Sequence, residues 1–359
     1  MTLLNPCTRS IGPSNAKIVF VGEAPGDQEE RTGIPFIGPA GQELRRLFVQ
    51  AGLVWSETYF TNVLRTRPPE NKMENFCVPK SQLPAGYPMP ALSPGKYLHP
   101  DLIPELERLW GELLSVRPNL IIAAGATAAW AVLRLNGINR LRGAIHESHF
   151  GKVLPIFHPA FLFKGPDGWA VRPIIVADLM KAVVERDYPD VRRPQRFILI
   201  DPTLPEVEEW RDILLSAPLL SVDTETQSRT ITLLGFSISP SRAIVIPFFD
   251  ARKLSFDPEQ GLFPGSYWTR KGEIRVRRIV NDVLSSDVPK LFQNGMFDVQ
   301  HLLGEGFRLR NIIEDTMIMH HALYPEMRKD LGFLGSIYTN EAAWKLLRPR
   351  GDDQNKKED

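Results

Sequence analysis

The chain of 359 residues is 43% hydrophobic and 24% charged, and it carries a formal net charge of +1 at pH 7. Its length suits two domains better than one, and its composition is that of an ordinary globular protein able to build two cores. The nearly neutral charge excludes a general attraction to nucleic acid, so any contact with DNA has to come from local patches.

The sequence also bears on the compartment. No apolar run approaches the length of a membrane span, and the N-terminus lacks the basic and apolar regions of a signal peptide. Cys7 and Cys77 are too few for a disulfide framework or a four-thiolate cluster, so we expect both to be reduced thiols. These features predict a cytoplasmic protein without a membrane partner.

Along the first half, short apolar strands alternate with amphipathic helices. This order predicts a three-layer α/β domain with a parallel sheet, whose ligands bind at the carboxyl ends of the strands. A proline-rich stretch at 67–104 is too irregular for a helix or a strand and predicts a long surface loop. We expect strands at 17–21, 58–64, 119–124 and 153–157, and helices at 42–51, 102–116, 125–135 and 174–184.

The first strand runs into a glycine-containing loop, "VFVGEAPGDQEERTGIPFIGPAG" at 19–41. Its glycines lack the G-x-G-x-x-G spacing of a dinucleotide site, and the Gly-Lys-Ser/Thr of a P-loop is absent. The carboxylates of Glu23, Asp27, Glu29 and Glu30 would repel a polyphosphate. We therefore expect this loop to hold something other than phosphates, such as a base and a water molecule.

The second half begins after "ERDYPDVRRPQR" at 185–196, where charge and proline mark a domain boundary. The segments "LLSVDTET", "LLGFSIS" and "AIVIPFF" predict an antiparallel meander of three strands. Other expected elements are a strand at 197–200 and helices at 204–215, 276–284, 297–305 and 315–322. The predicted organisation is a first domain at 1–186, a linker at 187–196, a second α/β domain at 197–345 and a charged tail at 346–359.

Six motifs of the first half occur in the order and approximate spacing of bacterial family 4 uracil-DNA glycosylases: "VGEAPG", "PFIGPAG", "TNVLRTRPPEN", "IIAAGATAA", "INRLRG" and "FHPAFLF". About residues 7–185 therefore resemble this family. The resemblance implies the uracil-glycosylase α/β sandwich and hydrolysis of the bond between uracil and deoxyribose in DNA, after the nucleotide is flipped out. It would place the protein in DNA repair or replication, in a bacterium or a phage-infected cell.

The resemblance also assigns a base pocket. Phe36 would stack on the flipped base, with a core phenylalanine as the alternative. Asn62 would read the donor and acceptor of the uracil edge, unless it only caps a turn. Backbone amides around Gly22 and Gly26 would help to hold the departing oxygen.

Glu23 and His158 are the implied catalytic residues of this half. His158 would donate a hydrogen bond to the uracil oxygen as negative charge builds there. Glu23 would orient water or oppose the positive charge of the sugar. The alternatives are a structural histidine and a solvated loop carboxylate.

One departure concerns iron. The family usually binds a four-iron cluster through four cysteines, one of them directly before "RPP", where this chain has Thr66. Threonine is no thiolate, so we expect no iron–sulfur cluster and a replacement by packing or by the proline-rich loop. Arg65, Arg67 and Lys72 still form a basic patch suited to DNA phosphates, as does Lys164, although such clusters are often merely solvated.

About residues 195–345 resemble another family, the 3′–5′ proofreading exonuclease domain of family A DNA polymerases, which has an RNase-H-like α/β fold. "SVDTET" puts Asp223 and Glu225 on one face of a strand, because side chains two apart point the same way. "FQNGMFDVQHL" supplies Asn294, a candidate DNA contact, and Asp298, and "EDTMIMHHAL" adds Asp315 as a further candidate ligand. The resemblance implies that these carboxylates hold Mg²⁺ or Mn²⁺ for phosphodiester cleavage.

The exonuclease resemblance is incomplete at its end. The family completes its site with a Tyr-x-x-x-Asp helix, but the positions four beyond Tyr324 and Tyr338 are Arg328 and Ala342. The expected domain therefore lacks its last metal carboxylate and its water-orienting tyrosine.

Three functions remain open at this stage. The chain is an active uracil-DNA glycosylase with an accessory exonuclease fold, a replication nuclease whose first half only binds DNA, or a non-catalytic subunit that binds DNA or docks a polymerase. The architecture resembles the front of phage-type family A polymerases that carry a glycosylase-like domain. We favour glycosylase chemistry, with uracil-containing DNA, single strands or 3′ ends as substrate and a separately encoded polymerase as a candidate partner.

Overall fold

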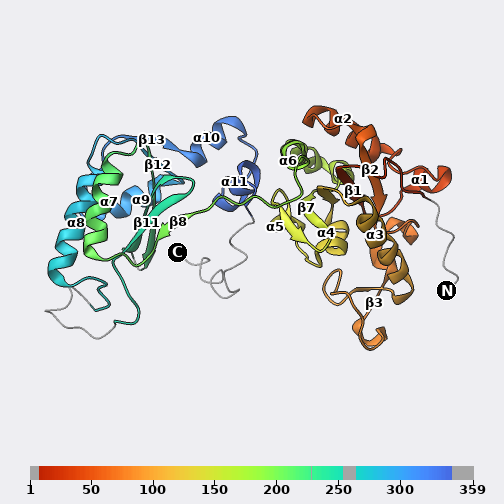
Figure 1. The fold of residues 1–359 in the computed structure, drawn as a ribbon, viewed down its shortest axis with the longest axis horizontal. Helices are drawn as coiled ribbons and strands as arrows, with labels where there is room; N and C mark the ends of the chain where they lie inside the picture. Colours follow the sequence, from red (N-terminus) through yellow and green to blue (C-terminus); the bar gives the residue numbers. More distant parts are fainter. Residues whose placement is uncertain (1–7, 228, 254–263, 342–359) are drawn as a thin grey trace. The chain divides into compact units, whose positions relative to one another are not determined.

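The computed structural model describes residues 8–227, 229–253 and 264–341. The chain forms two compact units, and each is described by itself (Figure 1). The first unit contains the described residues 8–192 and 332–341, and the second contains those between 193 and 331. No helix in this part of the chain is long and apolar enough to cross a membrane.

The first unit is built on a five-stranded sheet with the order β2-β1-β5-β7-β6. The strands β1 (Ile18–Gly22), β2 (Thr58–Asn62), β5 (Leu120–Ala124) and β7 (Gly151–Ile156) are parallel, and β6 (His146–Ser148) is an antiparallel edge strand. β1 and β5 are buried along their whole length, as expected for parallel strands covered on both faces. The predicted three-layer α/β domain is confirmed.

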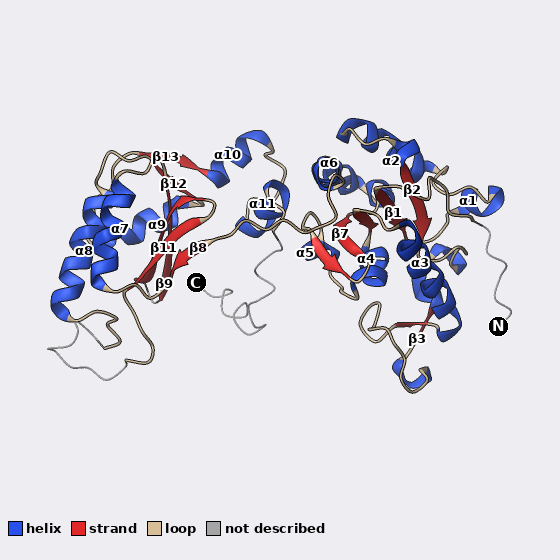
Figure 2. Cartoon of the chain, in the orientation of Figure 1, coloured by secondary structure: helices blue, strands red, loops and turns tan. Residues whose placement is uncertain are grey.

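Helices cover both faces of this sheet (Figure 2). Val19 and Val21 belong to a buried cluster with α3 (Ile103–Val116) and α4 (Ala126–Leu133). Phe20, between them, points the other way and meets Phe48 of α2 (Pro39–Ala51), which packs against α6 (Arg172–Glu185). The shorter helices are α1 (Asp27–Thr32) and α5 (Ile138–Leu141), and η6 (Pro159–Phe163) and η7 (Pro166–Val171) precede α6.

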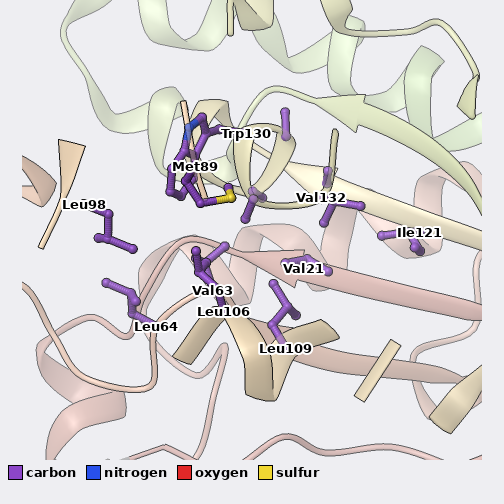
Figure 3. Close-up of a cluster of buried hydrophobic side chains, with 14 of the residues drawn as sticks. Val21, Val63, Leu64, Met89, Leu98, Leu106, Leu109, Ile121, Trp130 and Val132 are labelled. Atoms are coloured by element: carbon purple, nitrogen blue, oxygen red, sulfur yellow. The ribbon is translucent and has the colours of Figure 1, made fainter. Parts of the chain in front are cut away.

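The stretch at 67–104 is more ordered than expected. It contains the short helices η2 (Pro69–Asn71), η3 (Met73–Phe76), η4 (Lys80–Gln82) and η5 (Pro100–Leu102), and β3 (Cys77–Val78) pairs with β4 (Tyr97–Leu98). The expectation of a stretch without helix or strand was wrong because its apolar side chains are buried. Figure 3 shows Met89 and Leu98 of this stretch in the cluster that contains Trp130 of α4.

The second unit is built on a six-stranded sheet with the order β13-β12-β9-β10-β11-β8. β9 (Leu220–Gln227), β10 (Thr230–Ser239) and β11 (Arg242–Pro247) form the predicted antiparallel meander. β12 (Lys290–Phe292) and β13 (Ile312–Asp315) extend it in parallel beyond β9, and β8 (Phe197–Leu199) is parallel to β11. This strand order confirms the RNase-H-like α/β fold, although the sequence prediction missed the short strands β12 and β13.

The helices of the second unit are close to those predicted. α7 (Leu204–Leu215) and α8 (Arg270–Leu284) pack together, and their apolar residues share a core with the meander. α9 (Gly295–Gly304) and α10 (Thr316–Leu323) each follow one of the two extra parallel strands.

The C-terminal part of the described chain differs from the expected division. After α10, the chain forms α11 (Leu331–Tyr338), and residues 332–341 group with the first unit rather than with a domain at 197–345. The physical reason is a set of buried polar contacts with the first unit, among them the Arg142 guanidinium donating to Ser336 at 2.9 Å. The whole of the predicted tail, together with Ala342, lies outside the described residues.

Candidate active site

The carboxyl ends of four parallel strands bring the candidate residues of the first unit together. Gly22 ends β1 directly beside Asn62, which ends β2. Glu23 follows β1, and His158 follows β7 two residues after Ile156. The Gly125 amide, at the end of β5, donates to the carbonyl of Ile156 at 2.9 Å. These polar groups therefore gather at the edge of the sheet where parallel sheets usually bind ligands.

Gly22 allows Asn62 and Phe36 to meet at this edge. A Cβ atom at Gly22 would lie 2.3 Å from Asn62 Oδ1 and 3.0 Å from the ring tip of Phe36, so no larger residue fits without displacing them. Asn62 is only 5% exposed. The Asn62 amide can therefore lie beside the Phe36 ring only because Gly22 has no side chain.

Phe36 belongs to the core and also lies against Gly22 at this edge. Its ring lies 5.4 Å from Phe20, edge to face, and 5.5 Å from Phe60, between centroids. Its φ of 58° is in the left-handed region, which is uncommon for a bulky residue. The two interpretations of this phenylalanine, core residue and stacking platform, are compatible in this position.

Glu29 braces the glycine-containing loop from inside. Its carboxylate accepts a hydrogen bond from the Gly38 amide at 2.9 Å, and it lies against Gly26 on its other side. The side chain is buried, whereas the sequence suggested one more carboxylate of an acidic loop. The sequence feature that could have indicated this burial is the pair Gly26 and Gly38, which leave room for the Glu29 carboxylate.

Glu23 is held at this edge by a residue that sequence reasoning missed. The hydroxyl of Thr127, in the first turn of α4, donates to Glu23 Oε2 at 2.5 Å. Thr127 lies within the quoted "IIAAGATAA" motif, but only the fold shows that it faces β1. One carboxylate oxygen of Glu23 is thereby oriented.

His158 is kept neutral by its surroundings. Burial, and secondly the positive charge of Lys164, lower the pKa of His158 from 6.5 to about 4. Its Nδ1 accepts the Ala160 amide at 3.1 Å, because the ring caps η6. In the neutral ring the proton then sits on Nε2, which leaves that nitrogen as a hydrogen-bond donor.

The candidate DNA contacts of the first unit are mostly held by carboxylates. Arg65 donates to Glu105 at 2.7 Å, a hydrogen bond that raises the pKa of this arginine. Arg67 donates to Asp27 at 3.2 Å, and Lys72 pairs with Glu70 at 3.0 Å.

Lys164 lies in different surroundings, because its ammonium is 6.0 Å from the ring of Phe161. Phe161 and Phe163 of η6 are large exposed apolar side chains, at 40% and 51% exposure. A cation beside exposed rings suits contact with unpaired bases better than a carboxylate-bound arginine does.

Thr66, at the position of the missing cysteine, is buried. Cys77 is half-buried, burial raises the pKa of its thiol, and Cys7 lies outside the described residues. Within the described ranges, no group of three His, Cys, Asp or Glu side chains is arranged to hold a metal ion. The absence of iron remains a prediction, which the visible absorbance of freshly purified protein would test.

In the second unit, three carboxylates approach one another. Asp223 and Glu225 lie on the exposed side of β9, while the alternate residues Val222 and Thr224 are buried. Asp298, in the first turn of α9, accepts the amide of Thr224 at 2.9 Å and its hydroxyl at 2.6 Å. Loss of water around the carboxyl raises the pKa of Asp223 to about 6, and the charges of Asp298 and Glu225 add to this shift.

Asp315 is bound to backbone amides instead of lying with these three carboxylates. It accepts the amides of Asn294 at 3.1 Å and Gly295 at 2.7 Å, and that of Met317 at 2.8 Å. It therefore caps the N-termini of both α9 and α10. Asn294 precedes α9 with a left-handed φ of 57°, so this backbone bend and its cap hold the helix that carries Asp298.

The first unit is an α/β domain that carries an amide, a carboxylate and a neutral imidazole at the carboxyl edge of its parallel strands. Residues 9–179 match the family described as the uracil DNA glycosylase superfamily. The chain is 32% identical over 184 residues to a type-4 uracil-DNA glycosylase of Thermotoga maritima. The matched region spans 50% of this chain and 83% of that protein. The chain is 34% identical over 165 residues to the Archaeoglobus fulgidus enzyme of the same name, at 44% and 71% coverage. The chain belongs to the uracil DNA glycosylase superfamily and resembles its type-4 members.

Other similarities are more distant. The chain is 26% identical over 157 residues to a DNA polymerase of Bacillus phage SP01, covering 43% of this chain and 14% of that protein. The match to the structure of Escherichia coli RNase D covers 42% of this chain and 34% of the RNase D chain, at 13% sequence identity and with a TM-score of 0.28. The EXD2 exonuclease domain soaked in Mn covers 35% and 58% at 15% identity, with a TM-score of 0.24. The fold of the second unit therefore rests on its own strand order.

Proposed function

We propose that the first unit hydrolyses the N-glycosidic bond of uracil in DNA. The observation that carries the proposal is the meeting of Phe36, Asn62, Glu23 and His158 at one edge of the parallel sheet. The similarity to type-4 uracil-DNA glycosylases supports it. The substrate is a nucleotide flipped out of DNA, since a base paired within a duplex cannot present its edge to Asn62 and its sugar to Glu23.

Each side chain has a role in this reaction. The Asn62 amide donates to and accepts from the uracil edge, while Phe36 contacts the face of the base. As the bond between the sugar C1′ and uracil N1 breaks, its electron pair moves onto uracil, and the Nε2–H of neutral His158 donates to the oxygen that becomes negative. Glu23, oriented by Thr127, holds the water that bonds to C1′ and takes up its proton.

The test is release of free uracil from a labelled single strand that contains one uracil. We expect His158→Ala to lower the rate by roughly two to three powers of ten, as when one oxyanion donor is removed. Asn62→Asp should reduce discrimination between uracil and cytosine. His149→Ala, which changes an exposed histidine of the same unit, is the matched control. No uracil release, or release that His158→Ala leaves unchanged, would refute the proposal.

We propose that DNA binds at η6 and the adjacent Lys164 rather than at Arg65 and Arg67. Lys164 would meet a phosphate while the exposed rings of Phe161 and Phe163 stack on unpaired bases. Arg65, Arg67 and Lys72 would first have to leave their carboxylates. Comparing the DNA affinities of Lys164→Ala and Lys72→Ala tests this order, because only the first is expected to weaken binding clearly.

A second candidate function is 3′–5′ cleavage of DNA by the second unit. Asp223, Glu225 and Asp298 carry carboxylate oxygens, the type of donor that Mg²⁺ and Mn²⁺ prefer, although the described side chains are not arranged as a three-residue metal site. With a metal bound there, they would support phosphodiester hydrolysis. Asp315 is committed to helix capping, so only three carboxylates remain from the predicted set. We propose weak metal-dependent activity, or DNA binding alone, for this unit unless a separately encoded polymerase supplies further groups.

A further inference from the structure

A buried ion pair in the first unit extends to the C-terminal helix. Arg142, which follows α5, is 2% exposed and donates from Nε to Asp178 of α6 at 2.9 Å, with a second bond from Nη2. Its remaining nitrogen, Nη1, donates to the hydroxyl of Ser336 on α11 at 2.9 Å. The guanidinium thus joins two helices that lie far apart in the sequence.

The side chain of Lys181, on α6, binds backbone carbonyls at the end of α11. Its ammonium donates to the carbonyls of Gly143 at 2.5 Å, Ser336 at 2.6 Å and Thr339 at 2.5 Å. A cation is well placed at the carboxyl end of a helix, where carbonyls lack partners. Gly143 is part of the fit, since a Cβ atom there would lie 2.4 Å from the Ser336 carbonyl oxygen.

Asn340 closes the contact beyond the helix. Its carbonyl accepts the Ile145 amide at 3.2 Å, and its side chain donates to Glu185 at 2.8 Å. Residues 332–341 therefore make hydrogen bonds with the segment around Arg142 and with α6. The second unit is an insertion in the chain of the first unit, between α6 and this segment.

The same arginine reaches the His158 loop. Its guanidinium lies 5.7 Å from the ring centre of Phe157, which directly precedes His158, and 5.8 Å from that of Phe333 on α11. The Phe157 ring is stacked on Phe161 of η6, with 5.7 Å between centroids. Two rings and one guanidinium thus connect the C-terminal helix to the loop that carries the proposed hydrogen-bond donor.

We propose that residues 332–341 are a positioning clamp for the His158 loop, acting through Arg142 and Phe157. The effect on catalysis rests on the proposed glycosylase function, whereas the effect on the loop does not. The geometry needed for catalysis is then complete only when the segment after the second unit has docked. Arg142 and Ser336 are positioning residues in this arrangement, because neither touches the proposed substrate site.

The test compares two substitutions on α11 in the full chain. Ser336→Arg puts a second cation against buried Arg142 and should displace the helix. Gly335→Ala is the matched control, because a Cβ atom there would meet nothing within 4 Å. Hydrogen exchange of residues 155–163 and single-turnover uracil release are measured for both, together with DNA affinity.

We expect Ser336→Arg to speed exchange at 155–163 and to slow uracil release at saturating protein about ten- to hundredfold, as for a misplaced catalytic group. DNA affinity should fall as well, because the proposed DNA contacts of η6 lie in the same segment. Gly335→Ala should match the parent. Truncation after residue 331 should speed exchange and slow uracil release as Ser336→Arg does. Adding a synthetic peptide of residues 329–341 should return both to the values of the parent.

Two outcomes would overturn the clamp. One is unchanged exchange at 155–163 in Ser336→Arg. The other is faster exchange throughout the first unit, which would make α11 a general stabiliser. If the parent chain releases no uracil, the proposed function fails, and the exchange comparison still decides the clamp.

Discussion

At Gly22, the absence of a side chain lets an amide and an aromatic ring meet. We predict that Gly22→Ala lowers uracil release more than it lowers stability, because its Cβ atom would lie 2.3 Å from Asn62 Oδ1. Misplacing the amide should cost about a hundredfold in the rate constant. Single-turnover kinetics and urea unfolding of the same preparation check this. An active Gly22→Ala protein would show that Asn62 does not bind the base.

His158 gives a prediction about pH. Its pKa is about 4 in the folded chain and 6.5 when unperturbed, so the unfolded chain binds more protons between these values. The stability contributed by the neutral ring is therefore complete above pH 6.5 and is lost as the pH falls through about 4. Urea unfolding at several pH values should show this loss in the parent chain and a smaller loss in His158→Asn.

At the scale of elements, the stretch at 67–104 is stabilised by packing against α4. Trp130 is fully buried beneath it and donates from Nε1 to the Pro90 carbonyl at 3.1 Å, and the Tyr87 hydroxyl donates to the Leu98 carbonyl at 2.7 Å. Figure 3 shows the Trp130 ring beside Met89. These contacts fix the stretch onto α4.

We predict that Trp130→Phe destabilises the first unit by about 1–3 kcal/mol, because the half-buried Pro90 carbonyl loses its donor. Trp169→Phe, at a half-exposed tryptophan of the same unit, should have little effect. Urea unfolding, followed by circular dichroism, compares the two. Equal stability of both variants would mean that this contact does not hold the stretch.

At the scale of the whole molecule, the second unit carries the three carboxylates that we propose as metal ligands, Asp223, Glu225 and Asp298. We predict that the chain binds Mn²⁺ and digests single-stranded 3′ ends slowly or not at all, because a three-carboxylate site leaves one metal and the attacking water poorly held. Binding should tighten as the pH rises through about 6, since a proton on Asp223 competes with the metal.

An end-labelled single strand and a metal-dependent time course provide the measurement. Asp223→Ala should abolish any digestion and weaken Mn²⁺ binding, whereas Asp287→Ala, at an exposed aspartate of the same unit, should not. Adding a polymerase fragment with a Tyr-x-x-x-Asp helix is expected to raise the rate. Rapid digestion by the chain alone would mean that another carboxylate, such as Asp330, completes the site.

The sequence alone determined the features that depend on neighbouring residues or on a regular period. Short apolar runs located the main strands, and the period of two placed Asp223 and Glu225 on one face. Asn62 and His158 were placed at the ends of strands, and parallel strands end at one edge of a sheet. Their roles in catalysis remain predictions.

Only the tertiary structure decided how side chains distant in the sequence meet. Thr127 orients Glu23 across 104 positions, and Arg142 binds Ser336 across 194. Asp315 caps two helices instead of joining the other carboxylates, although its motif reads as a ligand. Such contacts follow from how strands and helices pack around two cores, and no local pattern encodes which polar groups that packing leaves opposite one another.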